Sequence, residues 1–455
     1  MSTTPFESRK LFSNGADTQV ATTLPNRERS SPDKMSVDSQ RFNVASTWTA
    51  PSLSLSDRIA GLDQLIRHEQ NRRPLRVMIL GIRGFPNVQG GAEKHAEKLA
   101  YSLSEFGCDI EAIVRNDYVP KGTTQWHKIK IVRLWNSKTK GVETFVHTFC
   151  GVLYAAWKRP DILHIHGIGP AIFTPIARML GLRVVVTYHS LNYEHAKWGR
   201  FARKLLRLGE WAGIKFSNAQ ITVSDTLARL MNGRYGAHAV PIPNGLDKPI
   251  IIETNRLLDA FGLLPKRYAL IVARIDEAKR QLDLIDAYSR INSPKFKLAL
   301  VGEADHFGPH ARAVAEAAEN TPGVVMLGRQ TGDALAELYT HAGVFVLPSS
   351  HEGQPIAVLE AASYGLSAIL SDIPAHREIG LAETRYFEVG DVASLARHLV
   401  DFFAESTLRR LPATDQARLI ASHDWNDIAR RTLEIYCSAI FKRDICKVNA
   451  KRSRS

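Results

Sequence analysis

Short apolar runs alternate along this chain with longer segments whose apolar residues recur at helical spacing. Apolar runs of this kind are typical of parallel strands that are buried on both faces. Strands and helices that interleave predict doubly wound α/β domains. The expected strands are 76–81, 109–114, 129–134, 184–186, 219–223, 268–273, 325–328 and 344–348, and the main expected helices are 142–157, 171–180, 333–341 and 424–442.

The stretch 344–374 reads as strand, polar loop, helix and strand. Pro355 stands where proline is best tolerated, in the first turn of a helix. The free N–H groups of Gly353, Gln354 and Ile356 would point at whatever lies above the strand, and such a helix N-terminus binds phosphate. Two carboxylates, Glu352 and Glu360, accompany the turn. The spacing alone leaves two interpretations open, an anion site or an ordinary βαβ unit with two solvated glutamates.

A glycine-rich loop follows the first strand, with glycines at 81, 84, 90 and 91 ahead of a helix that begins near Gly91. Glycines let the backbone approach a ligand closely. The loop matches neither the dinucleotide motif nor a P-loop. A donor loop and a merely flexible loop both fit this pattern.

Single polar residues also stand at the carboxyl ends of predicted strands, where open α/β sheets bind ligands. His189 follows the strand at 184–186, and Arg274 and Lys279 flank the turn after the strand at 268–273. An arginine and a lysine in such a turn can clamp a diphosphate, or both can be surface charges. His164 and His166 alternate on another strand end without further metal ligands nearby, so a structural or acceptor-facing role is expected.

Composition adds limits on class and partners. At 455 residues with 44% hydrophobic content, the chain can bury two cores. The net charge of +13 favours an anionic partner, and no nucleic-acid module is recognisable. Neither a secretory signal nor a transmembrane run is expected. The four cysteines show no metal or redox spacing, which fits a reducing, cytoplasmic compartment.

The segment 197–215 combines lysines and arginines with apolar residues and two tryptophans at helical spacing. A basic amphipathic helix of this kind is typical of a membrane interface. The alternative is a helix packed on the core with a solvated basic face.

Polar and proline-rich segments divide the chain. Residues 1–52 are predicted to be disordered, and residues 241–250 form a rigid connection. The predicted organisation is a disordered segment 1–52, a first domain 74–243, a second domain 248–422, a helix 424–442 that crosses back to the first domain, and a basic tail 443–455 without regular structure.

Several motifs resemble those of the retaining glycosyltransferases of the GT-B fold, family 4, in particular a bacterial polysaccharide-building subgroup. Glu352 and Glu360 match the E-x7-E motif, and the residues after Glu352 match E-G-x-P. The loop R-G-x-P…G-G-x-E, the segment T-Y-H-S around His189 and the connection P-N-G-x-D match as well. Arg274 and Lys279 match the R-x4-K of G-R-x4-K-G, whereas Ala273 and Arg280 replace its two glycines.

The resemblance implies two Rossmann-like domains facing a cleft and a hexosyl transfer from a nucleotide sugar to a saccharide or lipid-linked acceptor. It implies no divalent metal and no other cofactor. The residues it places at the sugar are His189 and Glu352, and those it places at the donor are Gly90, Gly91, Arg274, Lys279, Gly353, Gln354, Pro355, Ile356 and Glu360. Glu93 and Lys94 are further candidates.

The resemblance also implies a cytoplasmic enzyme of polysaccharide biosynthesis, peripheral at the inner face of the plasma membrane. Two alternatives stay open, a nucleotide-sugar epimerase of the same fold and a non-catalytic protein that binds nucleotide sugars or membranes. The donor sugar, the acceptor, the linkage and the oligomeric state cannot be read from the sequence.

Overall fold

The computed structural model describes residues 73–137, 142–190, 199–291, 295–305, 307–405 and 410–452, with side chains to residue 440. The segment 1–52, predicted to be disordered, and an amphipathic helix expected at 56–67 lie outside the described residues. The first two residues of the basic segment 197–215 lie outside them as well.

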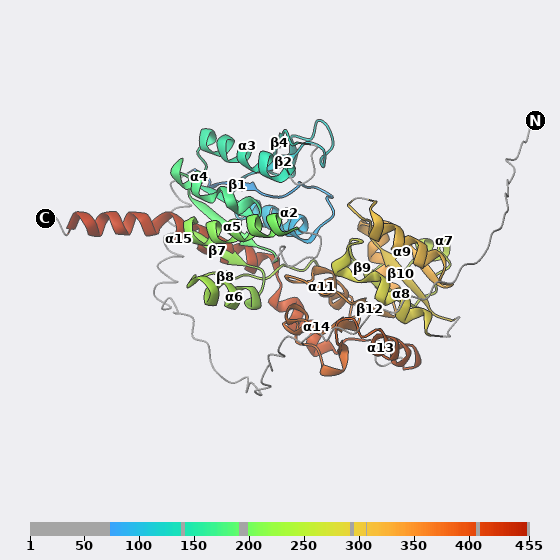
Figure 1. Ribbon diagram of the computed structural model, residues 1–455. Coiled ribbons are helices and arrows are strands. Elements are labelled where there is room, and N and C mark those ends of the chain that lie inside the picture. The colour runs from blue at the N-terminus through green and yellow to red at the C-terminus, as the bar shows by residue number, and fades with distance from the viewer. Residues whose placement is uncertain are drawn as a thin grey trace, which may run out of the picture. The chain divides into compact units, whose positions relative to one another are not determined.

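The first sheet has eight strands in the order β3-β4-β2-β1-β5-β6-β7-β8, and only the β3–β4 pair is antiparallel (Figure 1). The strands are β1 (Arg76–Leu80), β2 (Asp109–Arg115), β3 (Gln125–Trp126), β4 (Ile129–Leu134), β5 (Ile162–His166), β6 (Val184–Tyr188), β7 (Ala219–Thr222) and β8 (Val240–Pro241). Its helices are α2 (Gly91–Glu105), α3 (Glu143–Lys158), η1 (Pro170–Phe173), α4 (Thr174–Met179), α5 (Arg200–Phe216) and α6 (Asp225–Tyr235).

Alternate residues of β1 serve the two faces of this sheet, as the period of a strand requires. Val77 and Ile79 belong to a core that includes residues of α2, whereas Met78 and Leu80 belong to a core with residues of α3 and η1. Because both faces are covered, the central strands are mostly apolar, and the polar residues of β5, His164 and His166, are buried.

The second sheet has six parallel strands in the order β11-β10-β9-β12-β13-β14. They are β9 (Tyr268–Val272), β10 (Lys297–Val301), β11 (Val324–Met326), β12 (Val344–Leu347), β13 (Ala368–Ser371) and β14 (Tyr386–Phe387). The helices are α7 (Arg256–Ala260), η3 (Glu277–Lys279), α8 (Gln281–Ser289), α9 (Pro309–Glu319), α10 (Gly332–His341), α11 (Ile356–Ser363), α12 (Pro374–Arg377), η4 (Glu383–Arg385), α13 (Val392–Ala404) and α14 (Ala413–Ser422).

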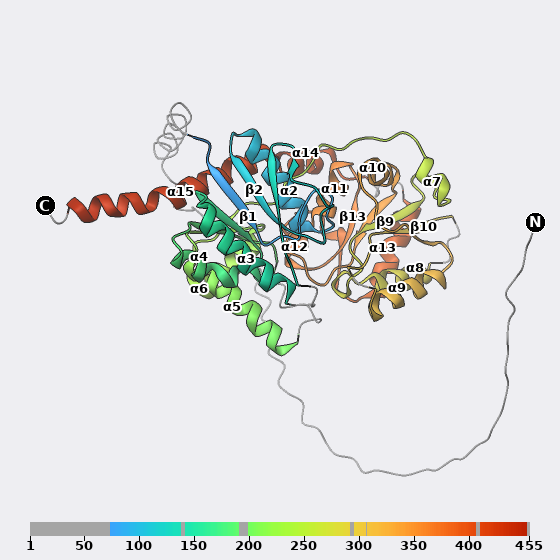
Figure 2. The ribbon, with the colours of Figure 1, turned by 90° about the horizontal axis from the view of Figure 1, so that it is seen from above.

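The last helix, α15 (Trp425–Arg452), returns from the second sheet to the first (Figure 2). Its residues Trp425, Ile428 and Tyr436 are buried in the same core as β1 and α2. The crossing agrees with the prediction, but the helix continues beyond the predicted end at Lys442. The prediction that the tail lacks regular structure was therefore wrong for the residues up to Arg452. The helix can continue because no proline or glycine interrupts residues 426–452.

The predicted α/β architecture with two parallel sheets is confirmed, and its strands follow the apolar runs closely. One helix differs: the segment predicted as 171–180 is a 3-10 turn followed by a short α-helix. Pro170 and Pro175 each stand in the first turn of one of the two pieces, where the missing N–H costs nothing. The predicted domain boundaries, 74–243 and 248–422, stay a prediction.

Candidate active site

Both sheets have a point at which the strand order reverses, and ligands bind at the carboxyl ends of strands at such points. In the first sheet the reversal lies between β1 and β5, and in the second it lies between β9 and β12. The loop after β1 carries the glycines, and β5 ends at His166. The loop after β9 carries Arg274 and Lys279, and the loop after β12 carries Glu352.

In the second domain, Lys279 and Glu352 form an ion pair between Nζ and Oε1. Both side chains are largely buried. Burial alone would raise the pKa of the Glu352 carboxyl, but the charge of Lys279 outweighs it and holds that pKa below its usual value. Glu352 is therefore a carboxylate at neutral pH, and the positive charge beside it is fixed in place.

Arg280 stands where the resembled motif has a glycine, yet the backbone keeps the conformation that favours glycine. Its φ is 50°, in the left-handed region. The guanidinium Nε donates to Asp283 Oδ2 at 2.6 Å, in the first turn of α8. The replacement therefore leaves the turn between Lys279 and α8 intact.

The N-terminus of α11 meets the first domain through backbone atoms. Pro355 caps the helix. A Cβ placed on Gly353 would lie 1.6 Å from the carbonyl oxygen of His189, so only glycine permits this approach. A Cβ placed on Gly91 would lie 3.7 Å from Ile356. Gln354 accepts from the backbone N–H of Asn244 at 2.5 Å.

Glu360 joins the same two elements through side chains. Its Oε1 pairs with Lys94 of α2, and its Oε2 accepts from the Tyr339 hydroxyl at 2.9 Å. Burial would lower the pKa of the Lys94 ammonium, but the charge of Glu360 raises it above its ordinary value. The second acid of the E-x7-E motif is thus held from both domains.

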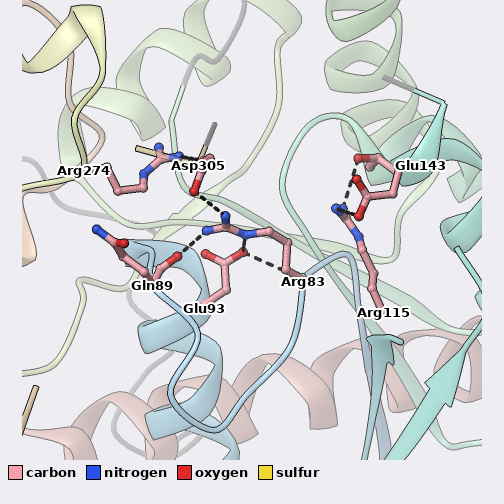
Figure 3. A network of polar contacts seen from close by, with 8 residues as sticks. Arg83, Gln89, Glu93, Arg115, Glu143, Arg274 and Asp305 are labelled. Atoms are coloured by element: carbon pink, nitrogen blue, oxygen red, sulfur yellow. Dashed lines mark hydrogen bonds and ion pairs between the residues drawn. The ribbon is translucent and has the colours of Figure 1, made fainter. Parts of the chain in front are cut away.

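A second ionic contact between the domains centres on Asp305, in the loop after β10 (Figure 3). Asp305 Oδ1 lies 2.9 Å from Arg83 NH1, and Oδ2 pairs with Arg274 NH1. Arg83 also pairs with Glu93 at 2.9 Å and donates to the carbonyl oxygen of Gln89. Burial would raise the pKa of Asp305, but Arg274 and then Arg83 hold it below its usual value.

Four imidazoles gather at the carboxyl ends of β5 and β6. His166 Nδ1 lies 3.0 Å from His189 Nε2, and the His189 ring stacks edge to face with His95 of α2 at 5.0 Å. His164 lies between the hydroxyls of Tyr436 and Thr187, each at 2.7 Å. Burial, followed by the neighbouring histidines, lowers the pKa of His95, His164 and His189 to about 3. These rings are neutral at physiological pH.

The contacts bring the predicted site residues into one region. Lys279 pairs with Glu352, the next residue Gly353 touches His189, and Gly91 and Lys94 of the first domain reach α11. Gly90 lies beside Arg83, whose NH2 would be 2.7 Å from an added Cβ. Their roles in catalysis stay predictions.

Sequence reasoning missed three participants, Arg83, Asp305 and His95. Arg83 opens the R-G-x-P motif and was available as a signal, whereas no local pattern marks Asp305 or His95. Glu378 accepts from the backbone N–H groups of Asp225 and Thr226 at 2.6 and 3.1 Å and so holds the start of α6.

In the part of the chain that the structure describes, no three His, Cys, Asp or Glu residues are arranged to hold a metal ion. No helix within the described ranges combines the length and apolar character needed to span a bilayer. The expectation of a metal-independent reaction stays a prediction.

Comparison with protein-family models gives one match in each domain. The model described as "Glycosyltransferase Family 4" matches residues 89–248, and the model described as "Glycosyl transferases group 1" matches residues 260–418. Between them the two matches take in the second switch point and every predicted site residue, whereas β1 precedes the first match.

Characterised relatives are similar over much of the chain. The phosphatidyl-myo-inositol mannosyltransferase of Mycolicibacterium smegmatis is 26% identical over 379 residues, which cover 77% of this chain and 90% of that protein. The alpha-maltose-1-phosphate synthase of Mycobacterium tuberculosis is 31% identical over 198 residues, which cover 40% of this chain and 51% of that protein.

Solved structures share the fold at lower identity. Sucrose-phosphate synthase from Thermosynechococcus elongatus aligns with a TM-score of 0.67 at 19% identity, over 80% of this chain and 98% of that chain. Anabaena HepE in complex with UDP and glucose aligns with a TM-score of 0.66 at 17% identity, over 80% of this chain and 99% of that chain.

Proposed function

Since this chain belongs to the glycosyltransferases of the GT-B fold, we propose that it transfers a hexose from a nucleotide-sugar donor to a saccharide or lipid-linked saccharide acceptor. The observation that carries the proposal is the Lys279–Glu352 ion pair, which adjoins a glycine packed on the backbone of His189. A cation, an ionised carboxylate and a helix N-terminus thereby converge at the contact between the two domains.

The diphosphate of the donor is bound by the second domain. Arg274 and Lys279 lie at the carboxyl end of β9, and the backbone N–H groups that begin α11 lie beside Glu352. Cations and a helix N-terminus stabilise the negative charge that develops on a leaving nucleoside diphosphate. HepE, whose fold is shared, was solved with UDP-glucose, which supports a nucleotide sugar as donor here.

The sugar lies between Glu352 and His189. Glu352 is ionised and can stabilise positive charge that develops at the anomeric carbon, whereas the neutral His189 ring can accept or donate a hydrogen bond to a hydroxyl. Glu360 holds the ribose hydroxyls. We infer retention of the anomeric configuration from the motif resemblance and assign no nucleophile.

The acceptor side of the first domain carries an aromatic and basic surface that we propose contacts an anionic membrane. On α5, Phe201, Leu208 and Trp211 are exposed together with arginines and lysines, and Phe201 is 78% exposed. The helix α3, which contacts η1 and α4 as α5 does, adds Trp157, which is 73% exposed. Apolar side chains flanked by cations are the chemistry of a helix that lies in a membrane interface.

Flotation with liposomes tests this surface. Wild-type protein should float with vesicles that contain anionic lipid at low salt, and Phe201→Ser with Trp157→Ser should reduce the floating fraction severalfold. Phe307→Ser is the matched control, because Phe307 is also 73% exposed but belongs to the second domain. Equal flotation of the double variant and the control would refute the membrane contact.

The donor is identified by thermal shift with UDP-, GDP-, dTDP- and ADP-sugars, since a ligand that binds only the folded protein raises the melting temperature. One donor class should raise it, and Lys279→Ala should abolish the shift. Mass and NMR analysis of the product should show a new glycosidic bond with the donor's configuration. An isomerised free nucleotide sugar would indicate an epimerase, and no turnover with any acceptor would indicate a binding protein.

A further inference from the structure

The Asp305 carboxylate is bound by two arginines that come from different domains. Arg83 belongs to the loop after β1, and Arg274 belongs to the loop after β9. Each guanidinium contacts a different oxygen of the same carboxylate (Figure 3). Two guanidiniums that converge on one small anion form an arrangement suited to phosphate, because their planar forks match phosphate as well as carboxylate.

Arg83 is held in place independently of Asp305. Its Nε pairs with Glu93, its NH2 donates to the carbonyl of Gln89, and its guanidinium lies 5.5 Å from the centre of the Tyr118 ring. The Arg83 side chain is only 15% exposed, whereas that of Asp305 is 38% exposed. The arginine is therefore the fixed partner, and the carboxylate is the one that solvent and ligands can reach.

We infer that Arg83 and Arg274 form a two-arginine phosphate site divided between the domains, in which the Asp305 carboxylate stands where a substrate phosphate binds. A phosphate displaces Asp305 and gains both guanidiniums. This inference rests on the proposed function, and it adds Arg83 of the first domain to the residues that bind a substrate phosphate, with Asp305 as an internal competitor.

The phosphate has two chemical sources, the diphosphate of a nucleotide donor and a phosphate on a lipid-linked acceptor. Both present oxygens that a guanidinium binds in a bidentate manner. If the site binds the diphosphate of the donor, a nucleoside diphosphate competes with a second phosphate for it. If the site binds a phosphate of the acceptor, the two ligands bind at the same time.

Arg115 gives an internal comparison for Arg83. Its guanidinium lies 5.9 Å from the same Tyr118 ring, but it pairs with Glu143 at 3.0 Å and its side chain is 8% exposed. Among the described residues, the Arg115 guanidinium donates to Glu143 and Thr144, which both belong to the first domain. The exposure and the shared carboxylate therefore distinguish Arg83 from an arginine with a structural role.

Calorimetric titration of the full-length chain with inorganic pyrophosphate tests the site. Asp305→Asn should tighten binding about tenfold, because it removes the competing charge while it keeps the shape of the side chain, and one charge-assisted hydrogen bond is worth about that factor. Arg83→Gln should weaken binding by about the same factor, and Arg83→Lys should recover only part of it. Lys98→Gln is the control, because it loses a 2.9 Å ion pair with Asp247 and should leave binding unchanged.

The same titration in the presence of saturating UDP, GDP, dTDP or ADP separates the sources. Competition assigns the site to the donor, and simultaneous binding assigns it to a phosphate of the acceptor. The inference is overturned if Asp305→Asn binds pyrophosphate no more tightly than the wild type. The expected increase in affinity is a clean test, because misfolding cannot produce it. Failure of the proposed function is distinguishable, because Arg83-dependent pyrophosphate binding would then persist without any turnover of nucleotide sugars.

Discussion

The carboxyl ends of the two sheets meet at the same place but offer opposite chemistry. The second sheet contributes ionised groups, and its cations Lys279 and Arg274 are each paired with a carboxylate. The first sheet contributes neutral imidazoles, whose pKa values burial lowers to about 3 at His164 and His189. The carboxyl ends of β9 and β12 are built around fixed charge, whereas those of β5 and β6 are built around uncharged hydrogen-bonding groups.

This difference matches the two halves of a glycosyl transfer. A leaving diphosphate gains negative charge, and preorganised cations stabilise that charge most when water is excluded. Sugar and acceptor hydroxyls remain uncharged, and neutral donors and acceptors such as imidazole orient them. The comparison therefore predicts that variants of the charged end lose catalysis, whereas a variant of the buried His164 changes stability and its dependence on pH.

The largest effect is expected from the charged end. Lys279→Ala should lower kcat/KM by about 100- to 1000-fold, the range seen when one group that stabilises developing charge is removed. Steady-state kinetics with the donor identified by thermal shift would measure it. Because the variant leaves Glu352 buried without its cation, Lys279→Met with Glu352→Gln serves as the stable reference. Wild-type kcat/KM in both variants would refute the role of the pair.

The second-largest effect is expected where the second domain contacts the first, at Gly353 and His189. Gly353→Ala places a methyl group 1.6 Å from the His189 carbonyl oxygen, so the α11 N-terminus must move. A displacement of about 1 Å costs about 100-fold in rate, which kinetics would detect without a large change in melting temperature. Gly233→Ala is the matched control, because no atom lies within 4 Å of its added Cβ on α6. Equal rates in the two variants would show that the contact is dispensable.

The smallest effect is expected at the histidine end and concerns stability. The pKa of His164 is about 3 in the folded state and about 6.5 when unfolded, so between these values the unfolded chain binds the additional proton. Stability is therefore complete above pH 6.5 and falls as the pH falls toward 3. At pH 5 His164 should account for about 2 kcal/mol of the loss.

Urea unfolding of wild type and His164→Asn at pH 7.5 and pH 5 would measure that contribution. The variant should lose about 2 kcal/mol less than the wild type between the two conditions. An identical pH dependence in the two proteins would contradict the assignment of a neutral, buried His164.

The strands and helices could be predicted well because each depends mainly on the residues of its own segment. The run at 344–347 and Pro355 placed β12 and α11 within one residue of their observed positions. The end of α15 was predicted too early. No proline or glycine stops the helix before Arg452, and the prediction gave this absence too little weight. Arg280 replaces a glycine of the resembled motif, yet it adopts the left-handed backbone there and pairs with Asp283.

The site was predictable only as far as motifs carried it. Glu352, Lys279 and Gly353 belong to recognisable spacings, and the structure brings them together. Asp305 was missed because its importance arises from two arginines that are distant in sequence and converge only after folding. The same is true of His95 of α2, which meets His189 only in the folded chain.

The chain crosses between the two domains twice, near Leu246 and near His423, and the two connecting segments contact each other. The backbone N–H of Leu246 donates to the His423 carbonyl at 2.7 Å, and Gly245 lies against the Trp425 indole. Two connecting segments that are hydrogen-bonded to each other are expected to act as one hinge. If the active site opens to admit a donor by rotation about Leu246 and His423, the ion pairs that Lys94 and Arg83 make between the domains must part.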